Sequence, residues 1–156
     1  MRIAVGSDHG GYELKVAVAA HLLSRDLDVV DVGVHERTSV DYPDQAQALI
    51  QLLLSGEADR GVLVCGTGQG MAMTANRVPG IRAAVVSDTF SASMASAHNN
   101  AQVLCLGERI IGVGLALQCV DAWLDTEYEG GRHDRRLGKM AAVGQLTRDV
   151  EQASEE

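Results

Sequence analysis

The sequence predicts an α/β protein, a three-layer α/β/α sandwich around a five-stranded parallel sheet. Short apolar runs rich in β-branched residues alternate with longer amphipathic segments along the 156 residues. This alternation is typical of parallel strands joined by helical crossovers in a Rossmann-like arrangement. The expected strands are apolar along their whole length, as strands covered on both faces are. No repeat or linker interrupts the pattern, so residues 1–150 are expected to form one domain and residues 151–156 an acidic tail.

Each expected element rests on its hydrophobic period and on the residues that bound it. Short apolar runs between turn residues predict strands, at residues 2–6, 28–31, 61–65, 82–86 and 103–106. Apolar residues at helical spacing predict helices, at residues 12–25, 44–55, from the turn after residue 65 to residue 76, 88–97, 113–125 and 134–150. In helix 113–125, the side chains expected to face inward are Leu115, Cys119, Val120 and Trp123. Gly56 ends one helix, and Gly130-Gly131 breaks the chain before the last one.

The composition argues against several classes of protein. The net charge of −8 disfavours a nucleic acid partner, because DNA-binding proteins present a basic face. Cys65, Cys105 and Cys119 are scattered without a CxxC pair, so no zinc site or redox motif is indicated, and no metal or cofactor is expected. The apolar run before Gly6 is too short for a signal peptide, and no stretch has the length of a membrane span. These observations favour a cytoplasmic protein that does not bind membranes.

Polar residues follow the first expected strand, at the carboxyl end where open α/β sheets bind their ligands. The chain there reads Gly6-Ser7-Asp8-His9-Gly10-Gly11, and its glycines allow the backbone to turn sharply beside a ligand. Asp8 and His9 are therefore candidates for contact with a substrate. In the structural alternative, Asp8 caps the following helix and His9 has no role.

A glycine-rich loop, Gly66-Thr67-Gly68-Gln69-Gly70, follows the third expected strand. Alternate glycines allow successive backbone N–H groups to converge on an anion, and the start of the next helix adds partial positive charge. The loop is neither a dinucleotide fingerprint, which needs glycine in place of Met71, nor a P-loop. Cys65 comes directly before it. A thiol in such surroundings can act as a nucleophile or a general base, whereas the alternative is a small buried hydrophobe.

Three later segments supply further candidates. His98, in Ala97-His98-Asn99-Asn100, can act as an acid or base because imidazole exchanges protons near neutral pH. Its alternative role is interaction with the helix dipole. Arg109 follows the fifth strand. Arg132 and Arg136 have a spacing that places both guanidinium groups on one helix face, where they can grip a phosphate or simply be solvated.

Five motifs occur in order: Ser7-Asp8-His9-Gly10-Gly11, Asp41-Tyr42-Pro43, Cys65-Gly66-Thr67-Gly68-Gln69-Gly70, His98-Asn99-Asn100 and Gly131-Arg132-His133. Together they resemble the ribose-5-phosphate isomerase B family, which also contains galactose-6-phosphate and allose-6-phosphate isomerases. The resemblance covers about residues 1–148. It implies an aldose–ketose isomerase that interconverts ribose 5-phosphate and ribulose 5-phosphate through an enediolate, in the pentose phosphate pathway and without a cofactor.

The resemblance also implies a role for each candidate residue. Cys65 matches the base that moves a proton between C1 and C2, and Gly66 to Gly70 supply amides that hold the enediolate oxygens, with Thr67 among the catalytic residues. His98 matches the residue that assists ring opening, and Asp8 lies close to that chemistry. The remaining matches are substrate contacts. His9, Arg132 and Arg136 match residues that hold the phosphate, and Gln69, Asn99 and Arg109 match residues that contact other parts of the substrate. Gln69 departs from the apolar residue that the family often has.

Assembly is a further implication of the resemblance. Family members are dimers or tetramers in which each site draws residues from two subunits, and their usual strand order is 2-1-3-5-4. The apolar residues of the last expected helix independently favour a packing partner, namely Leu137, Met140, Ala141, Val143 and Leu146. A homodimer, or a dimer of dimers, with sites at the subunit interface is therefore expected.

Other functions fit the same residues. The substrate can be a related sugar phosphate, such as allose 6-phosphate or galactose 6-phosphate. A binding module for a phosphate-bearing ligand would leave Cys65 and His98 without a chemical role. A thiol enzyme that forms a covalent intermediate on Cys65 is the third alternative.

Overall fold

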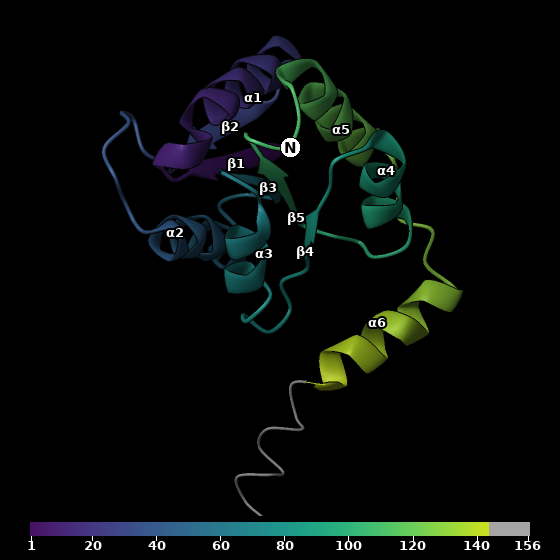
Figure 1. The fold of residues 1–156 in the computed structure, drawn as a ribbon. Coiled ribbons are helices and arrows are strands. Elements are labelled where there is room, and N and C mark those ends of the chain that lie inside the picture. The colour runs from purple at the N-terminus through teal and green to yellow at the C-terminus, as the bar shows by residue number, and fades with distance from the viewer. Residues whose placement is uncertain (144–156) are drawn as a thin grey trace, which may run out of the picture.

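The computed structural model describes residues 1–143 and contains the expected sandwich (Figure 1). Its strands are β1 (Arg2–Ser7), β2 (Asp28–Asp31), β3 (Arg60–Cys65), β4 (Ala83–Val85) and β5 (Val103–Gly107). Its helices are α1 (Tyr12–Ser24), α2 (Tyr42–Ser55), α3 (Gln69–Ala75), α4 (Thr89–Ala97), α5 (Val113–Asp125) and α6 (Arg132–Ala142), with a 3₁₀ turn, η1 (His9–Gly11), before α1. Within the described residues the sheet is parallel and five-stranded, in the order β2-β1-β3-β5-β4. The expected fold class and strand order are both confirmed.

The central strands bury side chains in two apolar layers. Ile3 and Val5 of β1 belong to the layer shared with α1, α4 and α5. Ala4 of β1 and Leu63 of β3 belong to the layer shared with α2 and α3. Because successive residues of a strand face opposite sides of the sheet, a strand that is apolar throughout can pack against both layers.

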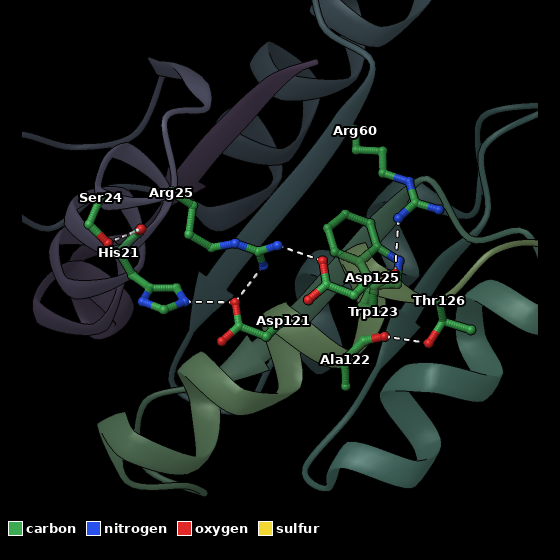
Figure 2. A network of polar contacts seen from close by, with 9 residues as sticks. All are labelled: His21, Ser24, Arg25, Arg60, Asp121, Ala122, Trp123, Asp125 and Thr126. Atoms are coloured by element: carbon green, nitrogen blue, oxygen red, sulfur yellow. Dashed lines mark hydrogen bonds and ion pairs between the residues drawn. The ribbon is translucent and has the colours of Figure 1, made fainter.

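Polar contacts join α5 to α1 and to the start of β3 (Figure 2). Arg25, which follows α1, forms ion pairs with Asp121 and Asp125 of α5. At the amino end of β3, the Arg60 guanidinium lies 4.7 Å from the centre of the Trp123 ring. It also donates a hydrogen bond of 3.0 Å to the Trp123 carbonyl oxygen. These contacts hold α5 firmly beside the sheet.

Two boundaries differ from expectation by two residues, and one burial expectation is wrong. Helix α2 begins at Tyr42 rather than at Asp44, because proline is accepted in the first turn of a helix. Helix α6 begins at Arg132 rather than at Asp134, directly after two glycines with φ of 62° and 58°. Leu115 is 38% exposed, and Ala116 takes the buried position on α5.

Part of the predicted C-terminal region lies outside the described residues, namely helix residues 144–150 and the acidic tail 151–156. Helix α6 extends away from the three layers (Figure 1). Among residues 1–143, no helix has both the length and the apolar character that crossing a bilayer requires.

Candidate active site

The ends of β1 and β3 lie side by side at the carboxyl edge of the sheet, with Ser7 opposite Val64. Asp8 follows β1 directly and is only 8% exposed. Its Oδ1 accepts a hydrogen bond of 2.9 Å from the Gly10 amide. Asp8 is therefore a cap, as the structural alternative expected, and its Oδ2 accepts no hydrogen bond from residues 1–143.

Gly11 brings the Asp8 turn into direct contact with β3. A Cβ atom at this position would lie 2.5 Å from the carbonyl carbon of Val64 and 2.8 Å from the nitrogen of Cys65. No side chain fits at such distances, so the close approach requires glycine. A Cβ atom on Gly10 would lie 3.4 Å from the Gly66 nitrogen. The turn that carries Asp8 and His9 thus borders the glycine-rich loop after Cys65.

Cys65 ends β3, and its thiol is enclosed by that loop. Its Sγ accepts a hydrogen bond of 3.1 Å from the Gly68 amide. Gly68 has φ of 80°, and a Cβ atom there would lie 3.2 Å from the Leu106 carbonyl carbon. The left-handed backbone that directs this N–H at the sulfur therefore strongly favours glycine. An amide aimed at sulfur provides a hydrogen bond for a thiolate.

The other two thiols have a different environment. Cys105 and Cys119 have no exposed surface in the described structure. Burial raises the pKa of the Cys105 thiol far above its usual range, and burial also raises the pKa of Cys119. Both thiols therefore stay protonated and pack as small buried hydrophobes.

Arg109, in the turn after β5, and Tyr42 of α2 flank the glycine-rich loop. The Arg109 amide donates a hydrogen bond of 3.1 Å to the Gly66 carbonyl oxygen, and a Cβ atom on Gly66 would lie 3.5 Å from the Arg109 side chain. The Tyr42 ring packs on Gly70, where a Cβ atom would lie 2.7 Å from the ring. A guanidinium and an aromatic ring therefore border the thiol loop. Thr67 and Gln69 of the loop are exposed, as is His9.

The remaining candidates lie at the opposite edge of the sheet. Helix α4 runs back from the carboxyl edge and ends directly before His98. Gln102, four residues later, accepts a hydrogen bond of 2.9 Å at its carbonyl oxygen from the amide of Gly61, at the start of β3. His98 therefore lies near the amino end of β3. At about 3.3 Å per residue, the length of β3 separates this edge from Cys65 by about 16 Å. Arg132 and Arg136 follow on α6.

The expected site residues thus form two groups. The carboxyl-edge group contains Asp8, His9, Cys65, the loop Gly66–Gly70 and Arg109. The amino-edge group contains His98, Asn99, Arg132 and Arg136. Within one chain the two groups lie at opposite ends of the strands, so His98 does not reach Cys65.

One cluster in the amino-edge region has the donor atoms of a metal site. Within the described residues, His98, Glu129 and His133 can bring one ligand atom each to within 4.8 Å of one another. The Nε of Arg132 lies 3.4 Å from the Nε2 of His133. This permanent positive charge disfavours a divalent cation at the cluster.

The fold and the carboxyl-edge group define a class of protein. Strand order reverses between β1 and β3, and open α/β proteins bind small molecules at such a switch point. Here the switch point carries a thiol, a carboxylate and a glycine-rich loop. Residues 3–140 match the family described as Ribose/Galactose Isomerase. The chain belongs to this family.

Individual relatives cover nearly the whole chain. Ribose-5-phosphate isomerase B of Escherichia coli is 43% identical over 92% of this chain and 97% of its own. D-erythrulose-4-phosphate isomerase of Pectobacterium atrosepticum is 44% identical over 90% of this chain and 93% of its own. The solved structure of Clostridium thermocellum ribose-5-phosphate isomerase B is 48% identical, with a TM-score of 0.92 over 94% of this chain and 99% of that chain.

Three residues that border the two groups had no role predicted from the sequence. Tyr42 and His133 stand inside motifs that carried the family resemblance, so their motifs were a usable signal. Glu129 stands outside every motif. Its place beside His98 depends on a tertiary contact between segments 31 residues apart in sequence number, for which the sequence has no local pattern.

Proposed function

We propose that this chain is an aldose–ketose isomerase that interconverts ribose 5-phosphate and ribulose 5-phosphate. The observation that carries the proposal is the Cys65 thiol, which accepts a hydrogen bond from the Gly68 amide at the switch point of the sheet. Relatives named ribose-5-phosphate isomerase B, which match more than nine-tenths of the chain, support this substrate. A cytoplasmic location and a place in the pentose phosphate pathway belong to the same proposal.

The reaction begins with opening of the furanose ring. The anomeric hydroxyl loses its proton, the C1 carbonyl forms as the bond from C1 to O4 breaks, and O4 gains a proton. An imidazole can both take up and release a proton near neutral pH. We assign His98 to this step, and Asp8 of a second copy of the chain to the same site as another polar group.

Isomerisation follows on the open chain. The Cys65 thiolate removes the proton from C2, and the electron pair of that bond forms the enediolate with its negative charge on O1. The thiol then returns the proton to C1, while the proton of the C2 hydroxyl moves to O1 and the C2 carbonyl forms. The Cys65 thiol itself forms no covalent bond with the sugar.

The loop Gly66–Gly70 is assigned to stabilisation of the enediolate. Backbone amides in fixed positions stabilise the developing oxyanion without reorganising during the reaction, and loss of one such donor typically costs about 10²–10³ in rate. Close packing supports this role, because a Cβ atom would lie 3.2 Å from the Leu106 carbonyl carbon at Gly68 and 2.7 Å from the Tyr42 ring at Gly70. Thr67, Gln69 and Arg109 are the exposed polar residues nearest these amides, and we assign them to the sugar hydroxyls.

Phosphate binding is assigned to His9, Arg132 and Arg136, and Asn99 to a further sugar contact. The two arginines are exposed on the first turns of α6. Guanidinium groups bind phosphate through paired, charge-assisted hydrogen bonds. In a chain of net charge −8, this local positive charge suits an anionic ligand.

A second copy of the chain is required to complete the site. One chain holds its amino-edge and carboxyl-edge groups at opposite ends of the sheet, so both groups can serve one substrate only across a subunit interface. Helix α6 supports such an interface, because Met140 and Val143 are 51% and 59% exposed. Burial of this apolar face against a second copy is favourable. We therefore propose a homodimer, or a tetramer built from dimers.

A panel of aldose phosphates tests the substrate. We expect the highest kcat/KM with ribose 5-phosphate, and lower values with allose 6-phosphate and galactose 6-phosphate. Erythrose 4-phosphate belongs in the panel, because a relative named D-erythrulose-4-phosphate isomerase is 44% identical. A higher kcat/KM with another sugar would reassign the substrate. Binding of every sugar phosphate without turnover would favour a binding module.

A further inference from the structure

His98 contacts two residues to which the proposed function gives no role, His133 and Glu129. The ring of His133 stacks on the ring of His98, with centroids 4.4 Å apart and planes 12° from parallel. His133 is only 3% exposed, whereas His98 is partly open to solvent. A buried ring therefore forms the wall against which the more exposed ring lies.

Glu129 holds this pair from the side. Its Oε2 lies 3.3 Å from the Nε2 of His133 and 3.9 Å from the Nε2 of His98. Its backbone amide also donates a hydrogen bond of 3.0 Å to the Ala97 carbonyl oxygen, directly before His98. Segment 129–133 is thus attached to the end of α4 by its backbone, by a carboxylate and by a stacked ring.

We propose that Glu129 and His133 are positioning residues for His98, and that they affect ring opening but not the proton transfer between C1 and C2. The proposal rests on the assignment of His98 to ring opening. It follows from their contacts, since Glu129 and His133 lie against His98, and within residues 1–143 neither of them contacts Cys65 or its loop.

The physical reason is the freedom of a histidine at a helix end. His98 caps α4, where its side chain would otherwise rotate about two bonds. Stacking on a buried ring restricts that rotation, and reaction rates are sensitive to small misplacements of a catalytic group. A carboxylate that is half exposed contributes little to stability, and the Glu129 side chain is 54% exposed. Its loss should therefore change the rate without unfolding the protein.

Two reactions separate the two steps. Turnover of ribose 5-phosphate requires ring opening. Ribulose 5-phosphate cannot close a five-membered ring through O5, because O5 carries the phosphate. Exchange of its C1 proton with deuterium from the solvent therefore requires Cys65 and the loop amides, but no ring opening. Proton NMR follows this exchange, and a coupled assay follows turnover.

The experiment compares Glu129→Gln and His133→Phe with the control Glu127→Gln. Glu127 is exposed, forms no ion pair within residues 1–143, and undergoes the same chemical change two positions away. We expect Glu129→Gln to lower kcat for ribose 5-phosphate about tenfold, with KM and C1 exchange nearly unchanged. His133→Phe keeps a stacked ring and should lose less than His133→Ala. The control should match the wild type in both assays.

Other results overturn the proposal. An equal fall of turnover and exchange in Glu129→Gln would indicate a general structural role, and unchanged turnover would indicate no role. His133→Ala can fail to fold, but Glu129→Gln decides the question without it. Failure of the proposed function would give a different result. The wild type would then exchange no C1 proton, or a Cys65→Ala variant would still exchange it.

Discussion

One hydrogen bond distinguishes Cys65 from the other two thiols of the chain. The sequence placed Cys65 before a glycine-rich loop, and the structure directs the Gly68 amide at its sulfur. Cys105 and Cys119 have thiols whose pKa is raised by burial. The sequence left two roles open for Asp8, and the structure confirms one of them, because a carboxylate oxygen caps the turn. Its contact with a substrate stays a prediction, because residue identity alone does not distinguish a cap from a ligand contact.

The contrast between the thiols predicts selective alkylation. Iodoacetamide should modify Cys65 at least about tenfold faster than Cys105 or Cys119, because only the thiolate reacts and the two buried thiols stay protonated. Activity should fall in step with labelling of Cys65, which mass spectrometry of peptides can follow. Bound ribose 5-phosphate should slow both processes.

Cys105→Ala provides the matched control for this labelling. It should keep turnover and the same rate of inactivation, because Cys105 has only packing contacts in the core. Inactivation that follows Cys105 or Cys119, or full activity in Cys65→Ala, would remove Cys65 from the role of base.

At the scale of elements, hydrophobic period located the strands and helices well, but the order of the strands came only from the family resemblance. Local period contains no information about which strand pairs with which. The start of α6 was also placed two residues late, because the sequence does not reveal that Gly130 and Gly131 both take positive φ. Leu115 was misplaced because a stripe at spacings of three and four residues runs through Ala116, Cys119, Val120 and Trp123 instead.

The contact between η1 and β3 gives a prediction at this scale. Gly11→Ala places a Cβ atom against the backbone of Val64 and Cys65, so the turn must shift. We expect the free energy of unfolding to fall by about 1–3 kcal/mol, as overpacking usually costs. The fall in kcat should be larger than this loss of stability explains, because Asp8 moves away from Cys65. Urea denaturation and the turnover assay measure the two effects.

Gly114→Ala is the control for this substitution, because a Cβ atom at Gly114 meets nothing within 4 Å and the residue lies in α5. Its stability should be equal to or above that of the wild type, since alanine favours helix over glycine. Equal behaviour of the two variants would show that η1 can move without cost.

At the scale of the whole molecule, the sequence identified the candidate site residues but could not show that they divide between the amino and carboxyl edges of the sheet. That division depends on the direction of α4, which carries His98 away from the strand ends that bear Asp8 and Cys65. A helix crossover always returns the chain to the starting edge of a parallel sheet. The proposed site therefore needs a second molecule to supply one of the two groups.

Hybrid dimers test this sharing directly. Cys65→Ala removes the proposed base from one edge, and Arg136→Ala removes a phosphate contact from the other, so each variant alone should be nearly inactive. After the two are unfolded together and refolded, a hybrid dimer contains one site in which Cys65 of one chain meets Arg136 of the other. We expect about one quarter of wild-type activity, because about half of the randomly formed dimers are hybrids and each has one of two sites intact.

Refolding each variant separately is the control and should restore nothing. No recovery in the mixture, with hybrids present by mass spectrometry, would mean that both residues act from one chain. The two groups would then have to approach by a rearrangement of α6, and an active monomer in sedimentation would be the corresponding sign.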